Sequence, residues 1–131
     1  MSLQIFPINE PLHFKCDNAT FMATLDGNRC KSESALLKEL GDIFRFPEYY
    51  GHNFDALFDC LTDLEWLGVD HVYLLIIHPA LICADEDNDR AREIFNVILS
   101  DVLRTFKHHP IHLHLIAEKS FIHLINPEPI D

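Results

Sequence analysis

The 131-residue chain is predicted to form a single α/β domain, in which a small parallel three-stranded sheet is packed with helices in two or three layers. Three observations support this fold class. Residues 72–77 are continuously apolar and rich in strand-forming side chains, a pattern typical of a strand buried on both faces of a parallel sheet. Strand patterns alternate with helix patterns along the chain, which favours right-handed crossovers between parallel strands. No repeat, low-complexity segment or linker indicates a second domain.

The first 18 residues are predicted to be an amino-terminal arm, and residues 19–131 to be the domain itself. Pro7 and Pro11 interrupt regular structure in the arm, where only residues 3–6 have the composition of a short strand. The sequence assigns no role to this arm.

The domain is predicted to begin with a strand at residues 21–25, which an Asp-Gly turn dipeptide closes. A helix over residues 35–44 follows, because its apolar residues recur at helical spacing. Ser32 or Ser34 is its expected N-cap, and the helix has to end before Pro47.

The segment at residues 46–66 is predicted to be a shaped loop followed by an amphipathic helix. Pro47 fixes its own backbone angle, and Gly51 can adopt positive φ without steric cost. Asn53 is a good N-cap, because its side-chain oxygen can accept a hydrogen bond from an unpaired backbone N–H. Apolar residues then follow at helical spacing: Phe54, Leu57, Phe58, Leu61 and Leu64.

The remaining elements complete the alternation. The strand at residues 72–77 is followed by a possible single helical turn at residues 79–84 and by a helix over residues 91–106. A last strand is predicted at residues 111–116. Residues 121–125 are expected to form a small extra strand.

The helix after Asn53 carries Asp55, Asp59 and Asp63 at i, i+4 and i+8, with no lysine or arginine between Arg45 and Arg90. Each like-charge pair at this spacing costs roughly 0.2–0.5 kcal/mol in an isolated helix. One interpretation is an ordinary solvated face. The two adjacent tyrosines of the preceding loop favour a second interpretation, an interface that receives a cationic partner.

A dense motif runs through this segment: Pro47-Glu48-Tyr49-Tyr50-Gly51, Asn53, Asp55-Ala56-Leu57 and Asp59-Cys60-Leu61-Thr62. It closely resembles the signature of the barstar family of intracellular ribonuclease inhibitors, and a looser similarity extends over about residues 22–117. The resemblance implies a barstar-like fold and a non-enzymatic immunity protein. Such a protein binds a basic, barnase-like ribonuclease or a related toxin and blocks its active site.

The resemblance also implies the partner-binding residues: Tyr49, Gly51, Asn53, Asp55, Phe58, Asp59 and Thr62. Asp59 is implied to enter the phosphate-binding pocket of the ribonuclease, Asp55 to pair with a basic side chain at its rim, and Tyr49 to pack on a catalytic histidine. Two departures stand out. Phe58 replaces the tryptophan usual in the family. Arg104 and Lys107 occupy the final turns of a helix that carries acids in the family, which leaves open a different partner.

The net charge of −11 repels nucleic-acid phosphates, so direct binding of DNA or RNA is not expected. The apolar runs are too short to span a membrane, and no secretory leader pattern opens the sequence. The four cysteines form no CxxC pair. We therefore expect a cytoplasmic protein with reduced thiols, without cofactor, metal or catalytic residues.

Several other patterns have a functional and a structural interpretation. Asp85, Asp87 and Asp89 imitate the start of a calcium loop, but the glycine and glutamate that such a loop requires are missing, so we expect helix capping. His112 and His114 share a strand face and could hold a metal, although scattered surface histidines are the favoured interpretation.

Cys60 lacks the signature of a catalytic nucleophile and is expected to be a half-buried structural thiol. Asp55 and Asp59 could serve a metal-dependent hydrolase, but two acids on one open helix do not enclose an ion. The main alternative to ribonuclease inhibition is an acidic interaction module for a non-ribonuclease toxin or a regulatory partner.

Overall fold

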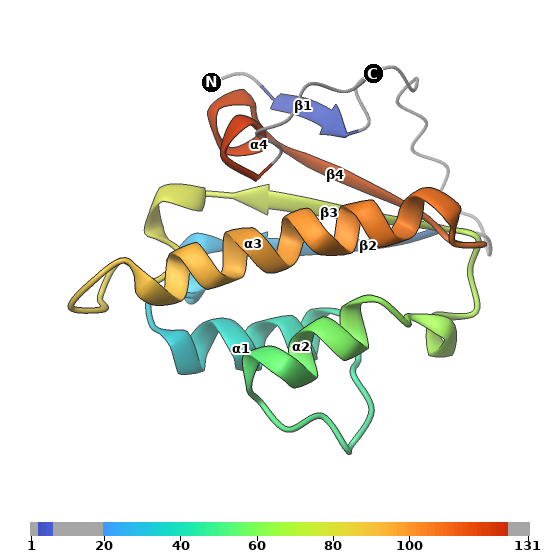
Figure 1. The fold of residues 1–131 in the computed structure, drawn as a ribbon, viewed down its shortest axis with the longest axis horizontal. Coiled ribbons are helices and arrows are strands. Elements are labelled where there is room, and N and C mark those ends of the chain that lie inside the picture. The colour runs from blue at the N-terminus through green and yellow to red at the C-terminus, as the bar shows by residue number, and fades with distance from the viewer. Residues whose placement is uncertain (1–2, 7–19, 126–131) are drawn as a thin grey trace.

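The computed structural model describes residues 3–6 and 20–125, and in this part of the chain a four-stranded sheet is packed with helices (Figure 1). The strand order is β1-β4-β3-β2. The strands are β1 Leu3–Phe6, β2 Thr20–Asp26, β3 His71–Ile77 and β4 His112–Glu118. β3 is central and pairs in parallel with β2 and β4, so the predicted parallel three-stranded sheet is confirmed.

The strand predicted at residues 3–6 is β1, which adds an antiparallel fourth strand by pairing with β4. Leu3 lies opposite Glu118 and Phe6 opposite Leu115. The rest of the predicted arm lies outside the described residues, and the domain boundary at residues 18 and 19 therefore stays a prediction.

The helices are α1 Glu33–Ile43, α2 Phe54–Leu61, α3 Arg90–Thr105 and α4 Lys119–Ile125. Short 3-10 helices follow β2, α2, β3 and α3, at Gly27–Arg29, Glu65–Leu67, Pro79–Leu81 and Phe106–His108. Both crossovers, β2-α1-α2-β3 and β3-α3-β4, advance in the same direction across the sheet. Right-handed connections therefore place α1, α2 and α3 on the same face.

The core lies between this face and the helices. Alternate residues of the parallel strands point into it, namely Ala23, Leu25, Val72, Leu74, Ile76, Leu115 and Ala117, and all are buried. β3 also has a buried residue on its other face, Tyr73, but Leu75 and Ile77 stay partly exposed there. The prediction of burial on both faces thus holds for only part of this strand.

The carboxyl-terminal element was predicted wrongly. Residues 121–125 were expected to form a strand, but they belong to the helix α4. A strand would alternate and bury His123, whereas a helix buries Phe121, Ile122 and Ile125 on one side and leaves His123 and Leu124 exposed. The helix keeps the imidazole in water, and burial of the apolar face outweighs the weak strand pattern.

Two helix starts follow the predicted capping chemistry. Ser32, one of the two predicted caps of α1, accepts a hydrogen bond from the backbone N–H of Ala35 at 3.2 Å. Asn53 caps α2. In the described part of the chain, no helix is both long enough and apolar enough to cross a membrane.

Candidate functional site

The loop between α1 and α2 projects on the side of these helices away from the sheet (Figure 1) and is fixed by Tyr50. Tyr50 is buried, and its hydroxyl donates to the backbone carbonyl of Leu37 in α1 at 2.9 Å. Its ring meets the ring of Phe46 edge-on at 4.8 Å. A Cβ at Gly41 would lie 3.0 Å from the Tyr50 ring, so glycine is what lets α1 approach so closely. These contacts anchor the loop to α1.

The side chain of Asn53 fixes the start of α2. Its Oδ1 accepts from the backbone N–H of Ala56 at 2.8 Å, which confirms the predicted N-cap. Its Nδ2 donates to the carbonyl of Gly51 at 3.4 Å. The same side chain therefore holds the end of the loop against the first turn of the helix.

Asp55 and Asp59 lie one helical turn apart on α2, and both are exposed. None of the ion pairs in the described part of the chain involves either carboxylate. Those ion pairs are Arg29–Glu39, Lys38–Asp42, His78–Asp26, Arg92–Asp89 and Arg104–Asp101. Two negative charges therefore face the solvent without a cation of this region to neutralise them.

Asp63, the third acid of the predicted row, does not lie on α2. α2 ends at Leu61, so Asp63 lies in the following turn, where its Oδ1 accepts from the backbone N–H of Glu65 at 3.3 Å. Leu64 adopts φ 58° and is fully buried, which ends the helix earlier than the apolar spacing predicts. Asp63 is thus outside the helix that carries Asp55 and Asp59.

The other predicted contact residues differ in exposure. Tyr49 is 74% exposed, the most exposed large hydrophobic residue in the described part of the chain. Gly51 and Asn53 are also exposed. Gly51 does not adopt the positive φ that the sequence suggested; the next residue, His52, does, with φ 54°. Phe58 packs partly against the core, and the hydroxyl of Thr62 donates to the Phe58 carbonyl at 2.8 Å. We use the term acidic face for Tyr49, Gly51, Asn53, Asp55 and Asp59, with Phe58 and Thr62 at its inner margin.

Cys60 lies beneath the acidic face and is 3% exposed, so it is buried more completely than predicted. Burial raises the pKa of its thiol, and the nearby carboxylates of Asp59 and Asp63 raise it further. A thiol with a raised pKa forms little nucleophilic thiolate at neutral pH. This environment fits the predicted structural role.

The interpretation of the histidines as scattered surface groups is wrong for His114, which is only 4% exposed. His114 Nε2 lies 3.2 Å from Nδ1 of His71, and the ring of His71 also stacks on that of His112 at 4.9 Å. These rings gather because β3 and β4 pair in parallel, with His71 opposite His112. The His-Leu-His pattern alone could not predict this cluster of rings, because it does not contain the register of β4 against β3.

Within residues 3–6 and 20–125, no group of three or more His, Cys, Asp and Glu side chains could hold a metal ion. The acidic run before α3 has structural contacts that differ from the expected capping. Asn88, and not Asp89, accepts from the first helical N–H, that of Arg90, at 2.9 Å. Glu86 accepts from the backbone N–H of Glu33 at 2.8 Å, at the start of α1.

Sequence reasoning missed the contacts that hold the acidic face in place. Tyr49 and Tyr50 are chemically identical, and only the pairing of the loop with α1 decides which of them is buried. Gly41, inside a helix pattern, was a signal of close approach that could have been used.

The family model for barstar, described as barnase inhibitor, matches residues 20–118, from the start of β2 to the end of β4. A candidate ribonuclease inhibitor of Bacillus subtilis (strain 168), YrdF, is 47% identical over 38 residues. This match covers 29% of the present chain and 42% of YrdF, so it spans less than half of that relative.

Proposed function

This chain belongs to the barstar family, and we propose that it inhibits a basic ribonuclease by placing the carboxylates of Asp55 and Asp59 over the active site of the enzyme. The proposed activity is binding, not catalysis. It agrees with the description of the family and with the name of the B. subtilis relative.

One observation carries the proposal: Asp55 and Asp59 are exposed on one face of α2 and have no ion-pair partner in the described part of the chain. Ribonucleases hold RNA phosphates with basic side chains, and carboxylates accept the same charge-assisted hydrogen bonds from these groups. Anchoring of the loop by Tyr50 lowers the ordering cost of binding, because the face is already formed.

Within this proposal Asp59 enters the phosphate-binding pocket, Asp55 pairs with a basic group at the rim, and Tyr49 packs on a catalytic histidine. The exposure of Tyr49, at 74%, makes its ring available for such a contact. The net charge of −11 accelerates the encounter with a cationic enzyme, and this acceleration weakens as salt is added.

The test is a titration of the purified protein into barnase during RNA hydrolysis. Inhibition should be complete at one equivalent. The double variant Asp55→Ala/Asp59→Ala should lose this inhibition. The matched control Asp85→Ala/Asp87→Ala removes the same charge from exposed positions outside the acidic face and should inhibit like the wild type. Equal behaviour of the two double variants would contradict the proposed site.

A second candidate is an interaction module for a non-ribonuclease toxin or a regulatory partner. It is favoured by the end of α3, where Arg104, which pairs with Asp101, and the exposed Lys107 replace the acids that the family resemblance implies there. Absence of barnase inhibition, together with capture of another basic protein that Asp55→Ala/Asp59→Ala does not capture, would support it.

A further inference from the structure

His52 is held in a defined position beside the acidic face. Its backbone has φ 54°, in the left-handed region that few residues other than glycine adopt. Its ring lies 4.6 Å from the ring of Tyr50, at an interplanar angle of 40°. Tyr50 is buried and hydrogen-bonded to Leu37 of α1, so its contact with the His52 ring restricts the position of the imidazole. His52 itself remains exposed.

Most charged groups around this position are acidic, and the cations have contacts elsewhere: Arg45, in the same loop, lies over the ring of Phe21 at 5.4 Å. The loop contributes Glu48, and α2 contributes Asp55 and Asp59. On α1, to which the loop is anchored, the cation Lys38 is bound to Asp42 at 2.8 Å. His52 is the only residue between positions 46 and 70 that can acquire a positive charge, because this stretch has no lysine, arginine or other histidine.

We propose that His52 makes partner binding at the acidic face dependent on pH: neutral His52 admits a cationic partner, and protonated His52 repels it. The inference rests on the proposed function and deepens it by adding a regulating residue. An imidazole gains its charge between about pH 8 and pH 5, where other side chains seldom titrate. The proton on His52 and the cationic partner oppose each other, so binding expels the proton and affinity falls as the pH falls.

The experiment uses the full chain and barnase as the probe, with dissociation constants measured at about pH 8 and about pH 5.5. The histidines of barnase also respond to pH. The informative comparison is therefore between the change in affinity of the wild type with pH and the same change for His52→Asn. Asparagine tolerates the left-handed backbone and carries no charge. His108→Asn is the matched control, because His108 is an exposed histidine in the 3-10 helix Phe106–His108, which follows α3.

On acidification, the wild type and His108→Asn should lose about fivefold more affinity for barnase than His52→Asn loses. This factor is what the repulsion between two partly screened charges about 8 Å apart would produce. His52→Lys, charged at both pH values, should bind about fivefold more weakly than the wild type at pH 8 and should show the same small pH effect as His52→Asn. The same pH effect in the wild type and in His52→Asn would overturn this inference alone. Absence of barnase binding at pH 8 would overturn the proposed function and this inference with it.

Discussion

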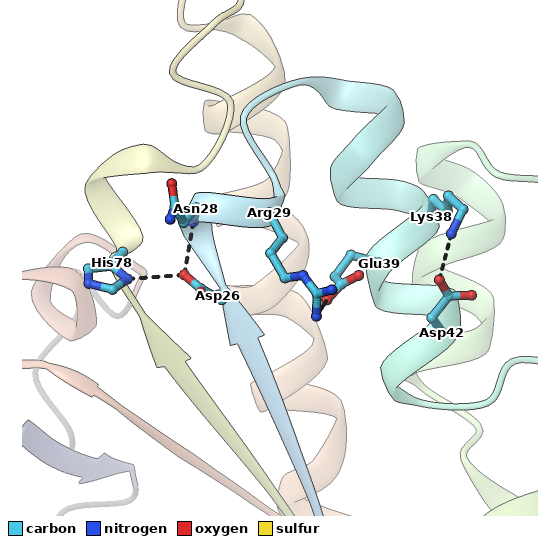
Figure 2. Close-up of polar contacts among 7 residues, drawn as sticks. All are labelled: Asp26, Asn28, Arg29, Lys38, Glu39, Asp42 and His78. Atoms are coloured by element: carbon cyan, nitrogen blue, oxygen red, sulfur yellow. Dashed lines mark hydrogen bonds and ion pairs between the residues drawn. The ribbon is translucent and has the colours of Figure 1, made fainter.

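Two regions of the molecule differ in whether their acidic side chains have partners. Around the end of β2 and along α1, which we call the paired region, acids have partners: Asp26 with His78, Glu39 with Arg29 and Asp42 with Lys38 (Figure 2). On the acidic face, Asp55 and Asp59 have none in the described part of the chain.

The difference shows in the protonation of the paired groups. The hydrogen bond from His78, and then that from the backbone N–H of Asn28, lower the pKa of Asp26. The hydrogen bond to Asp42 raises the pKa of Lys38. Such charges already have their interactions inside the chain. The carboxylates of the acidic face form no ion pair in the described part of the chain, so they remain available to bind a cationic partner.

The largest expected effect distinguishes the two acids nearest the end of α2. Asp59→Ala should weaken ribonuclease binding by about 3–5 kcal/mol, as when one member of a buried ion pair is removed. Asp63→Ala should have a much smaller effect, because Asp63 lies beyond the helix and bonds to the backbone of Glu65. Kinetic measurements on an immobilised ribonuclease should find the loss mainly in faster dissociation. Equal losses would contradict the assigned geometry.

The next effect concerns the stability of the paired region. A Cβ at Gly27 would overlap the backbone carbonyl oxygen of His78, which a side-chain adjustment cannot relieve. Gly27→Ala should therefore lower the free energy of unfolding by about 3 kcal/mol, measured by urea denaturation. Gly51→Ala is the matched change at the acidic face, where the nearest atom is the Nδ2 of Asn53 at 3.1 Å. The contact can be relieved by displacing the Asn53 side chain, so Gly51→Ala should cost no more than the N-cap bond of that side chain, about 1 kcal/mol.

A smaller effect separates two neighbours in sequence. Tyr50→Phe removes the buried hydrogen bond to the carbonyl of Leu37 and should lower the free energy of unfolding by about 1 kcal/mol. Tyr49→Phe should leave it unchanged, because this side chain is 74% exposed. Thermal unfolding of both variants provides the measurement. A loss at Tyr49 as large as that at Tyr50 would mean that the loop is not anchored as described.

These contrasts also show what the sequence could predict. Local chemistry was sufficient for the N-cap Asn53, for the parallel pairing of β3 and for the exposure of Asp55 and Asp59. Each of these depends on residues close in sequence or on a long apolar run.

Features that depend on distant contacts were missed. The helix at residues 119–125 forms because its apolar side packs into the core, and the burial of His114 depends on the register of β4 against β3. The early end of α2 depends on Leu64, which turns back into the core with φ 58°. Tertiary packing overrides a weak local preference at each of these positions.

The smallest expected effect is the change in stability when one carboxylate is removed, and it has opposite signs in the paired region and on the acidic face. The folded-state pKa of Asp26 lies below its usual value of 3.8, so its hydrogen bonds with His78 and with the backbone N–H of Asn28 add stability above that pH, and this contribution is lost as the pH falls through the lowered pKa. Asp26→Asn should therefore lower the urea midpoint at neutral pH, and the gap to the wild type should close below about pH 3.8. Asp59→Asn should instead raise the free energy of unfolding slightly at neutral pH, by roughly 0.2–0.5 kcal/mol, because it removes the like-charge pair with Asp55 at i, i+4 and a negative charge from the last turn of α2. If both substitutions lowered the stability equally, Asp59 would have a stabilising partner, and its carboxylate would not be available to a ribonuclease.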